Sequence, residues 1–114
     1  MRTILTALVL ALAAPAVAAQ ETHQVTLTLR EHRFSPAVVE VPAGRPIRIL
    51  LTNEDGAMEE FDSLDLGVEK DVTPHGQVSF LVGALKPGTY SFMGELHADT
   101  AQGEFHVAPT AATR

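Results

Sequence analysis

A chain of 114 residues suffices for one domain core and is too short for two. The absence of cysteine excludes disulfides, thiolate catalysis and attachment to lipid through a cysteine. The 14 acidic residues outnumber the 8 Lys and Arg and give a formal net charge of −6, which argues against nucleic acid and anionic membranes as partners. The acids are crowded between residues 54 and 71, where we expect something cationic to bind.

The first element in chain order is an apolar segment at the N-terminus. Arg2 precedes a mostly apolar run over residues 4–14, and small residues follow at 16–19. This pattern predicts a cleaved signal peptide over residues 1–19 and a single domain over residues 20–114 in the periplasm. The run is shorter than the roughly 18 to 20 residues that span a bilayer. We therefore expect no membrane insertion after cleavage.

Alternating apolar and polar residues then predict a series of short strands. Val25, Leu27 and Leu29 alternate with polar residues, as in a strand with one buried face. Pro and Gly supply the turns between such segments, so we predict an all-β sandwich. Residues 54–76 are expected to form long loops with a short strand around 60–63, and residues 108–114 a frayed tail. The other predicted strands are 38–41, 47–52, 78–82, 90–93 and 103–107.

No pattern indicates nucleophilic catalysis, a phosphate-binding glycine loop or a His-Glu-x-x-His zinc site, so metal binding is the chemistry that remains. The first candidate segment is residues 58–62. In an extended chain Glu60 and Asp62 share one face, while Phe61 points into the core. Two neighbouring carboxylates repel each other unless a cation compensates, which favours a divalent or trivalent metal. The alternative is a solvated acidic loop.

The second candidate segment is residues 93–97. Strand alternation would place Met93, Glu95 and His97 on a common side. Imidazole and carboxylate together suit first-row metals, and a thioether adds an option that favours Cu(I). The alternative is that Met93 packs in the core and His97 is an ordinary loop histidine.

Two further residues are candidate metal ligands, and each also has an alternative explanation without a metal. His32 follows the first strand and is expected to lean over an end of the sandwich, unless it is an ordinary loop histidine. Glu69 stands beside Lys70. It either forms a surface ion pair or adds a carboxylate ligand.

Over longer segments, from about residue 24 to 107, the chain resembles the cupredoxins. Residues 34–36, 39–44 and 49–53 resemble the early strands of that family, and residues 86–92 resemble the strand before its metal-binding loop. The resemblance implies a Greek-key β-sandwich.

In blue-copper cupredoxins that loop supplies Cys, His and Met, and an upstream His completes the site. Here Gly94 stands at the Cys position, and Glu59 or Glu60 stands at that of the upstream His. His97 matches the loop histidine. A blue-copper site is therefore absent, and rapid blue-copper electron transfer is not implied.

A closer resemblance is to cupredoxin-like proteins of bacterial ferrous-iron uptake, including EfeO-type domains and the small periplasmic subunit of four-component permease systems. The similar segments are residues 32–34, 59–63, 68–70 and 92–101. Carried over residue by residue, the resemblance implies one metal site made of His32, Glu60, Glu69, Glu95 and His97.

The leading hypothesis is a periplasmic protein that binds ferrous iron and delivers it to a membrane iron permease. Assistance with iron oxidation would require a periplasmic electron acceptor, and an accessory metal-binding role is expected more than an enzyme. A second hypothesis is a copper-binding or copper-handling protein that uses His32, Met93 and His97. A third is an adaptor without metal, whose acidic loop recognises a basic partner surface.

Overall fold

The computed structural model describes residues 3–11 and 21–109, and the predicted cleavage point after Ala19 lies outside them. Residues 3–11 form no helix or strand. No helix in the described ranges is both long and apolar enough to cross a membrane. Nine strands and one 3₁₀ turn follow in chain order: β1 (His23–Arg30), β2 (Arg33–Ser35), β3 (Val38–Pro42), β4 (Ile47–Asn53), β5 (Glu59–Ser63), β6 (Val68–Val72), β7 (Gln77–Val82), β8 (Gly88–Gly94), η1 (Glu95–His97) and β9 (Gln102–Ala108).

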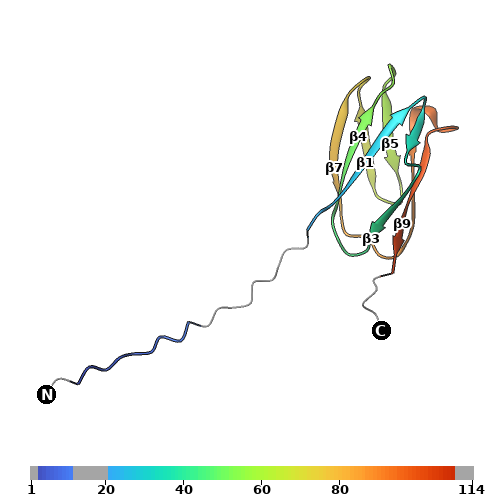
Figure 1. Cartoon of the computed structure of the whole chain (residues 1–114). Helices are drawn as coiled ribbons and strands as arrows, with labels where there is room; N and C mark the ends of the chain where they lie inside the picture. Colours follow the sequence, from blue (N-terminus) through green and yellow to red (C-terminus); the bar gives the residue numbers. More distant parts are fainter. Residues whose placement is uncertain (1–2, 12–20, 110–114) are drawn as a thin grey trace.

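The strands form two facing sheets, as Figure 1 shows. One sheet has the order β2-β1-β4-β7 and the other has the order β3-β9-β8-β5-β6. The pairs β1–β4 and β3–β9 are parallel, whereas every other pair in this part of the chain is antiparallel. The predicted all-β sandwich is confirmed, and so are the strands expected from alternation.

Two strands and one strand end differ from the sequence prediction. Residues 33–35 form β2, and residues 68–72 form β6 within the region expected to be loop. β2 has only three residues, which is too short for a period to be recognised, and β6 is exposed over most of its length and shows no alternation. The last strand continues to Ala108, so the predicted tail begins later, and residues 110–114 lie outside the described ranges.

The core between the sheets is built around five phenylalanines. The rings of Phe61 and Phe92 stack with centroids 5.0 Å apart, and Phe34, Phe80 and Phe105 pack against this pair. Branched aliphatic residues of β1 and β4 complete the core. Such burial of apolar surface is the main force that holds the sandwich together.

The alternation of side chains along β5 decides which acidic residues point into the sandwich. Phe61 is fully buried, and because strand side chains alternate, Glu59 and Ser63 are also buried. Glu60 and Asp62 therefore lie on the outer face, as predicted.

Candidate functional site

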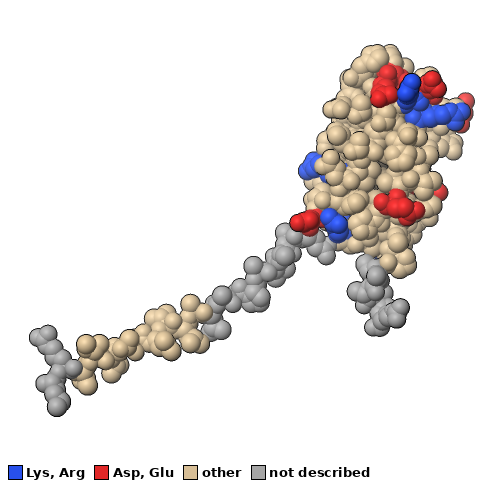
Figure 2. All heavy atoms as spheres, viewed as in Figure 1, with Lys and Arg blue, Asp and Glu red and all other residues tan. Residues whose placement is uncertain are grey.

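His32 is presented at the end of the sandwich by a tight turn after β1. Glu31 and His32 have φ angles of 53° and 56°, a region uncommon for residues other than glycine. The carboxylate of Asp55 stabilises this turn, since its oxygens accept hydrogen bonds from the backbone N–H groups of Glu31 at 2.8 Å and His32 at 3.0 Å. Figure 2 shows acidic and basic side chains gathered at this end, where β1 finishes.

The pKa of Asp55 agrees with its role in stabilising the turn at Glu31 and His32. Burial raises the pKa of Asp55, but the backbone hydrogen bonds from His32 and Glu31 and the nearby imidazoles of His32 and His97 outweigh it. The pKa of Asp55 therefore lies below its ordinary value of 3.8. An ionised Asp55 holds the turn that carries His32.

Asn53, at the end of β4, holds Asp55 in place. Its side chain is 1% exposed. The Nδ2 group donates hydrogen bonds to the carbonyl oxygens of Ala57 at 2.8 Å and Thr73 at 3.1 Å, and Oδ1 accepts one from the Asp55 N–H at 2.9 Å. A buried amide whose nitrogen and oxygen are both hydrogen-bonded makes the loop after β4 rigid.

His97 lies at the end of η1, directly against His32. The two imidazole rings stack with centroids 3.6 Å apart and an interplanar angle of 18°. Nδ1 of His97 lies 2.5 Å from Oε2 of Glu59. The carbonyl oxygen of His97 accepts hydrogen bonds from the N–H groups of Thr100 and Ala101, which fixes the turn after η1.

Glu59 is the buried carboxylate of this site, with 0% of its surface exposed. Its Oε1 accepts hydrogen bonds from the backbone N–H groups of Leu96 at 2.9 Å and Glu60 at 3.0 Å. Buried charges are tolerated in proteins when such partners are present. The three residues His32, His97 and Glu59 thus form one group, which we call the histidine site.

The five residues predicted to share one site fall into two places. His32 and His97 meet in the histidine site, whereas Glu60 and Glu95 meet on the outer face. Glu69 also lies on that face, opposite Asp62 in the β5–β6 pairing. No Lys or Arg in the described ranges forms a salt bridge, so the suggested Glu69–Lys70 ion pair is not observed.

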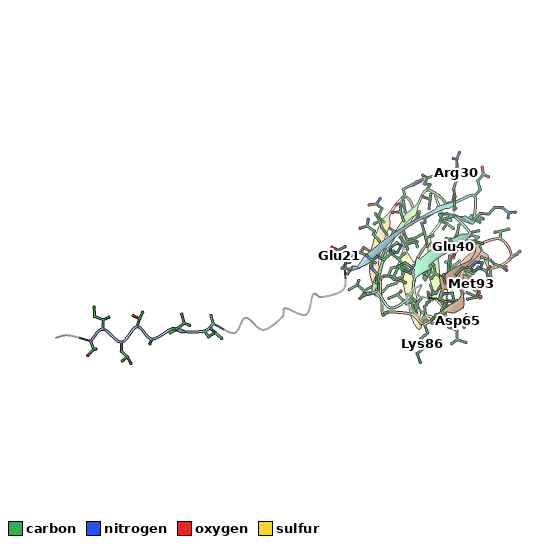
Figure 3. All side chains as sticks on the ribbon, turned by 60° about the horizontal axis from the view of Figure 1, so that its bottom comes forward. Glu21, Arg30, Glu40, Asp65, Lys86 and Met93 are labelled. Carbon is green, nitrogen blue, oxygen red and sulfur yellow. The ribbon has the colours of Figure 1, made fainter. Side chains whose placement is uncertain are left out.

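The expected common side is confirmed for Met93 and Glu95, which both lie beside Asp62, and is wrong for His97. Strand β8 ends at Gly94, and the 3₁₀ turn that follows breaks the alternation. His97 turns inward to Glu59, whereas Met93 is 42% exposed and pairs with Asp62 of β5. Met93 is labelled in Figure 3.

Glu60, Asp62 and Glu95 form an outer-face carboxylate cluster. The negative charge of Glu60 is the main cause that raises the pKa of Glu95 above its ordinary value, and a hydrogen bond with Asp62 adds to it. The like charges therefore repel each other at neutral pH. Across the described residues, no group of three or more His, Asp or Glu side chains is arranged to hold a metal ion.

A blue-copper centre does not fit the residues present. A Cβ atom added to Gly94 would lie 2.6 Å from Cδ of Glu59 and 2.8 Å from Cβ of Ala101. The Glu59 carboxylate therefore fills the space that a larger side chain at position 94 would need. Neither the thiolate nor room for it exists here.

The sequence prediction named Glu59 only as one of two residues at the upstream histidine position and left it out of the metal site, and it did not single out Asp55. The alternation in β5 held the signal for Glu59, because a residue two positions before the buried Phe61 faces the same way. Asp55 gave no such signal, since it lies in an irregular loop and acts on a turn 23 residues away in sequence.

Comparison with known proteins identifies the family. The model of the cupredoxin-like domain family matches residues 2–107. The uncharacterized protein RP394 of Rickettsia prowazekii (strain Madrid E) is 45% identical over 80 residues, which are 70% of this chain and 64% of that protein. The chain thus spans less than two thirds of that relative's length.

Solved structures show the same fold at low sequence identity. The metal-binding domain of the Cu(I)-exporting P-type ATPase CopA of Streptococcus pneumoniae D39, solved with Cu(I), has a TM-score of 0.66 and 12% identity over 76% of this chain and 86% of that one. Auracyanin A, a blue copper protein of Chloroflexus aurantiacus, has a TM-score of 0.66 and 14% identity over 76% and 99% of the chains. From the family match and this shared sandwich, we conclude that the chain belongs to the cupredoxin-like domain family.

Proposed function

We propose that this protein binds one transition-metal ion through the imidazoles of His32 and His97. The observation that carries the proposal is the proximity of these two rings, whose centroids lie 3.6 Å apart at one end of the sandwich. Their planes are nearly parallel, so the rings must turn slightly toward each other for both to bind one ion. Neutral imidazole is the commonest metal ligand in proteins. Each histidine is held by an acidic residue, His32 through its backbone by Asp55 and His97 through its ring by Glu59.

The donor set favours copper over iron at the histidine site. Two imidazoles without a thiolate suit copper, zinc or iron, and divalent copper binds such ligands most tightly. The carboxylates that would favour iron lie on the outer face, or are occupied by hydrogen bonds in the case of Glu59. Structural neighbours named for Cu(I) and blue copper support this choice. A copper ion held there would supply a redox-active centre to the protein.

The compartment forms part of the proposal. The apolar run and small residues over 1–19 have the pattern of a signal peptide, so we place the protein in the periplasm. A periplasmic copper carrier or buffer is the role that fits these features.

Ferrous-iron uptake is the second candidate, with delivery to a membrane permease and an electron acceptor for oxidation. One structural feature supports it, namely the proximity of the Glu60, Asp62 and Glu95 carboxylates. Oxygen ligands suit iron, and they stabilise Fe(III) over Fe(II). Otherwise this candidate draws on the resemblance of sequence segments alone.

Anaerobic titration of the metal-free protein with Cu(I), Cu(II) and Fe(II) tests the proposal. We expect one copper ion per chain, and a loss of affinity of at least about tenfold in His32→Ala and in His97→Ala. His106→Ala is the matched control, because His106 lies toward the far end of β9 and bonds only to glutamates.

The outcomes separate the two metals. Copper binding that depends on both histidines supports the copper proposal. Fe(II) binding that falls in Glu60→Gln and survives His97→Ala would support iron at the outer face instead. Copper affinity equal in wild type and His97→Ala would refute the proposed site.

A further inference from the structure

Glu59 has a place in the histidine site that differs from that of a metal ligand. Its carboxylate is wholly buried and has three partners, namely the N–H groups of Leu96 and Glu60 on Oε1 and Nδ1 of His97 on Oε2. No buried side-chain nitrogen or oxygen in the described ranges lacks a partner. Both oxygens of the Glu59 carboxylate are thus hydrogen-bonded within the protein.

We propose that Glu59 is a positioning residue that fixes the tautomer of His97. An ionised carboxylate only accepts hydrogen bonds, so the ring nitrogen that faces it must carry the proton. In a neutral imidazole the proton on Nδ1 leaves a lone pair on Nε2. Glu59 therefore aims the lone pair of His97 away from the carboxylate, in the form that binds a metal ion.

The surroundings of Nε2 agree with this assignment. Nε2 has no hydrogen-bond partner among the described residues, whereas Nδ1 has Glu59. Because no buried polar side-chain atom there is unpaired, Nε2 must reach solvent. The His97 side chain is 25% exposed, so a metal ion can approach it from outside.

Gly94 explains how the carboxylate is held in this position. The backbone of Gly94 is extended, with φ −90° and ψ 108°, so its conformation does not require glycine. What requires glycine is space, since an added Cβ would lie 2.9 Å from Oε1 of Glu59 and even closer to Cδ. Gly94 and Glu59 are therefore complementary in shape, and the carboxylate has little freedom to turn away from His97.

The tautomer belongs to the metal-free protein, whereas its effect on metal affinity rests on the proposed function. The first experiment therefore uses no metal. The ¹⁵N shifts of the imidazole nitrogens are measured by NMR at a pH above the ordinary histidine pKa of about 6.5. We expect the wild-type His97 to carry its proton on Nδ1.

Glu59→Gln is the matching variant, because glutamine keeps the size of glutamate. Its carbonyl oxygen can still accept from Leu96 and Glu60, which turns the amide NH₂ toward Nδ1 of His97. Nδ1 must then accept, and the proton moves to Nε2. We expect this tautomer shift together with a Cu(I) affinity about 10- to 100-fold weaker. Glu40→Gln on β3 should change neither quantity.

The outcomes keep the two proposals apart. A wild-type His97 protonated on Nε2 would overturn the inference by itself, even if Glu59→Gln does not fold. An unchanged tautomer in a folded Glu59→Gln would also overturn it. Nδ1 protonation without copper binding would leave the positioning role intact and refute the proposed function. Copper binding equally tight in wild type and Glu59→Gln would refute the positioning role alone.

Discussion

Replacing Gly94 with alanine tests how tightly Glu59 fills the end of the sandwich. The new Cβ would lie 2.6 Å from Cδ of Glu59 and 2.8 Å from Cβ of Ala101. Carbon atoms attract each other best at about 3.5 to 4.0 Å, so both contacts are strongly repulsive. The extended backbone of Gly94 accepts alanine without strain, and the cost is therefore steric alone.

The expected cost follows from the two opposing effects of this substitution. Overpacking of a filled core costs about 1 to 3 kcal/mol, and the reduced entropy of the unfolded chain returns about 0.4 to 1 kcal/mol. We expect the free energy of unfolding to fall by about 1 to 2 kcal/mol. For a domain of this size the melting temperature should fall by roughly 5 to 15 °C. Urea and thermal unfolding of the metal-free protein measure both quantities.

Gly83→Ala is the control for this experiment. A Cβ at Gly83 meets no atom within 4 Å, and its φ lies outside the left-handed region. The control should be as stable as the wild type or slightly more stable. If Gly94→Ala matches this control, the Glu59 carboxylate does not occupy the space beside Gly94, and the shape argument fails.

Three further predictions concern other parts of the domain. Asn53→Ala leaves buried hydrogen-bond partners unpaired and should lower the free energy of unfolding by about 1 to 3 kcal/mol in urea; an unchanged value would mean that water replaces the amide. A hydrogen bond with Glu104 raises the pKa of His106 above 6.5, and an NMR titration should show it falling in Glu104→Gln. A histidine whose pKa is raised by folding stabilises the folded state below pH 6.5, and this stabilisation is lost as the pH rises through the pKa of the folded state. The difference in the free energy of unfolding between wild type and Glu104→Gln should therefore shrink at higher pH. Met93→Leu should leave Cu(I) affinity unchanged because Met93 lies on the outer face, and a tenfold loss would identify the thioether as a ligand.

Most of the fold was predictable because burial imposes period-two alternation on the central strands. β1 and β4 alternate clearly, since each is paired on both sides and packs one face on the core. β6 could not be predicted in this way, because its burial pattern is mostly exposed. Its existence depends on pairing with β5, which is a tertiary contact.

The candidate site was predictable in part. The resemblance placed His32 and His97 in one site, where the structure also brings them together, but it left Glu59 out. It also added Glu60, Glu69 and Glu95, which lie on the outer face. The segments around residues 60 and 95 were identified, and the outward face of Glu60 and Asp62 followed from β5 alternation. What failed was the extension of alternation through residues 93–97, because the sequence does not show that β8 ends at Gly94. The stacking of His32 on His97 joins two turns 65 residues apart, and no local pattern encodes it.

The pairing of Glu59 with Gly94 links the packing of this domain to its chemistry. A buried carboxylate at position 59 needs donors, and the backbone of Glu60, the backbone of Leu96 and the ring of His97 supply them. The same carboxylate needs space, and only glycine at position 94 leaves it. A thiolate at position 94 would therefore have to displace the group that orients His97. Because both cannot occupy one place, the residues at this end of the sandwich fit the proposed imidazole site with a supporting carboxylate, and a blue-copper site is excluded by shape as well as by composition.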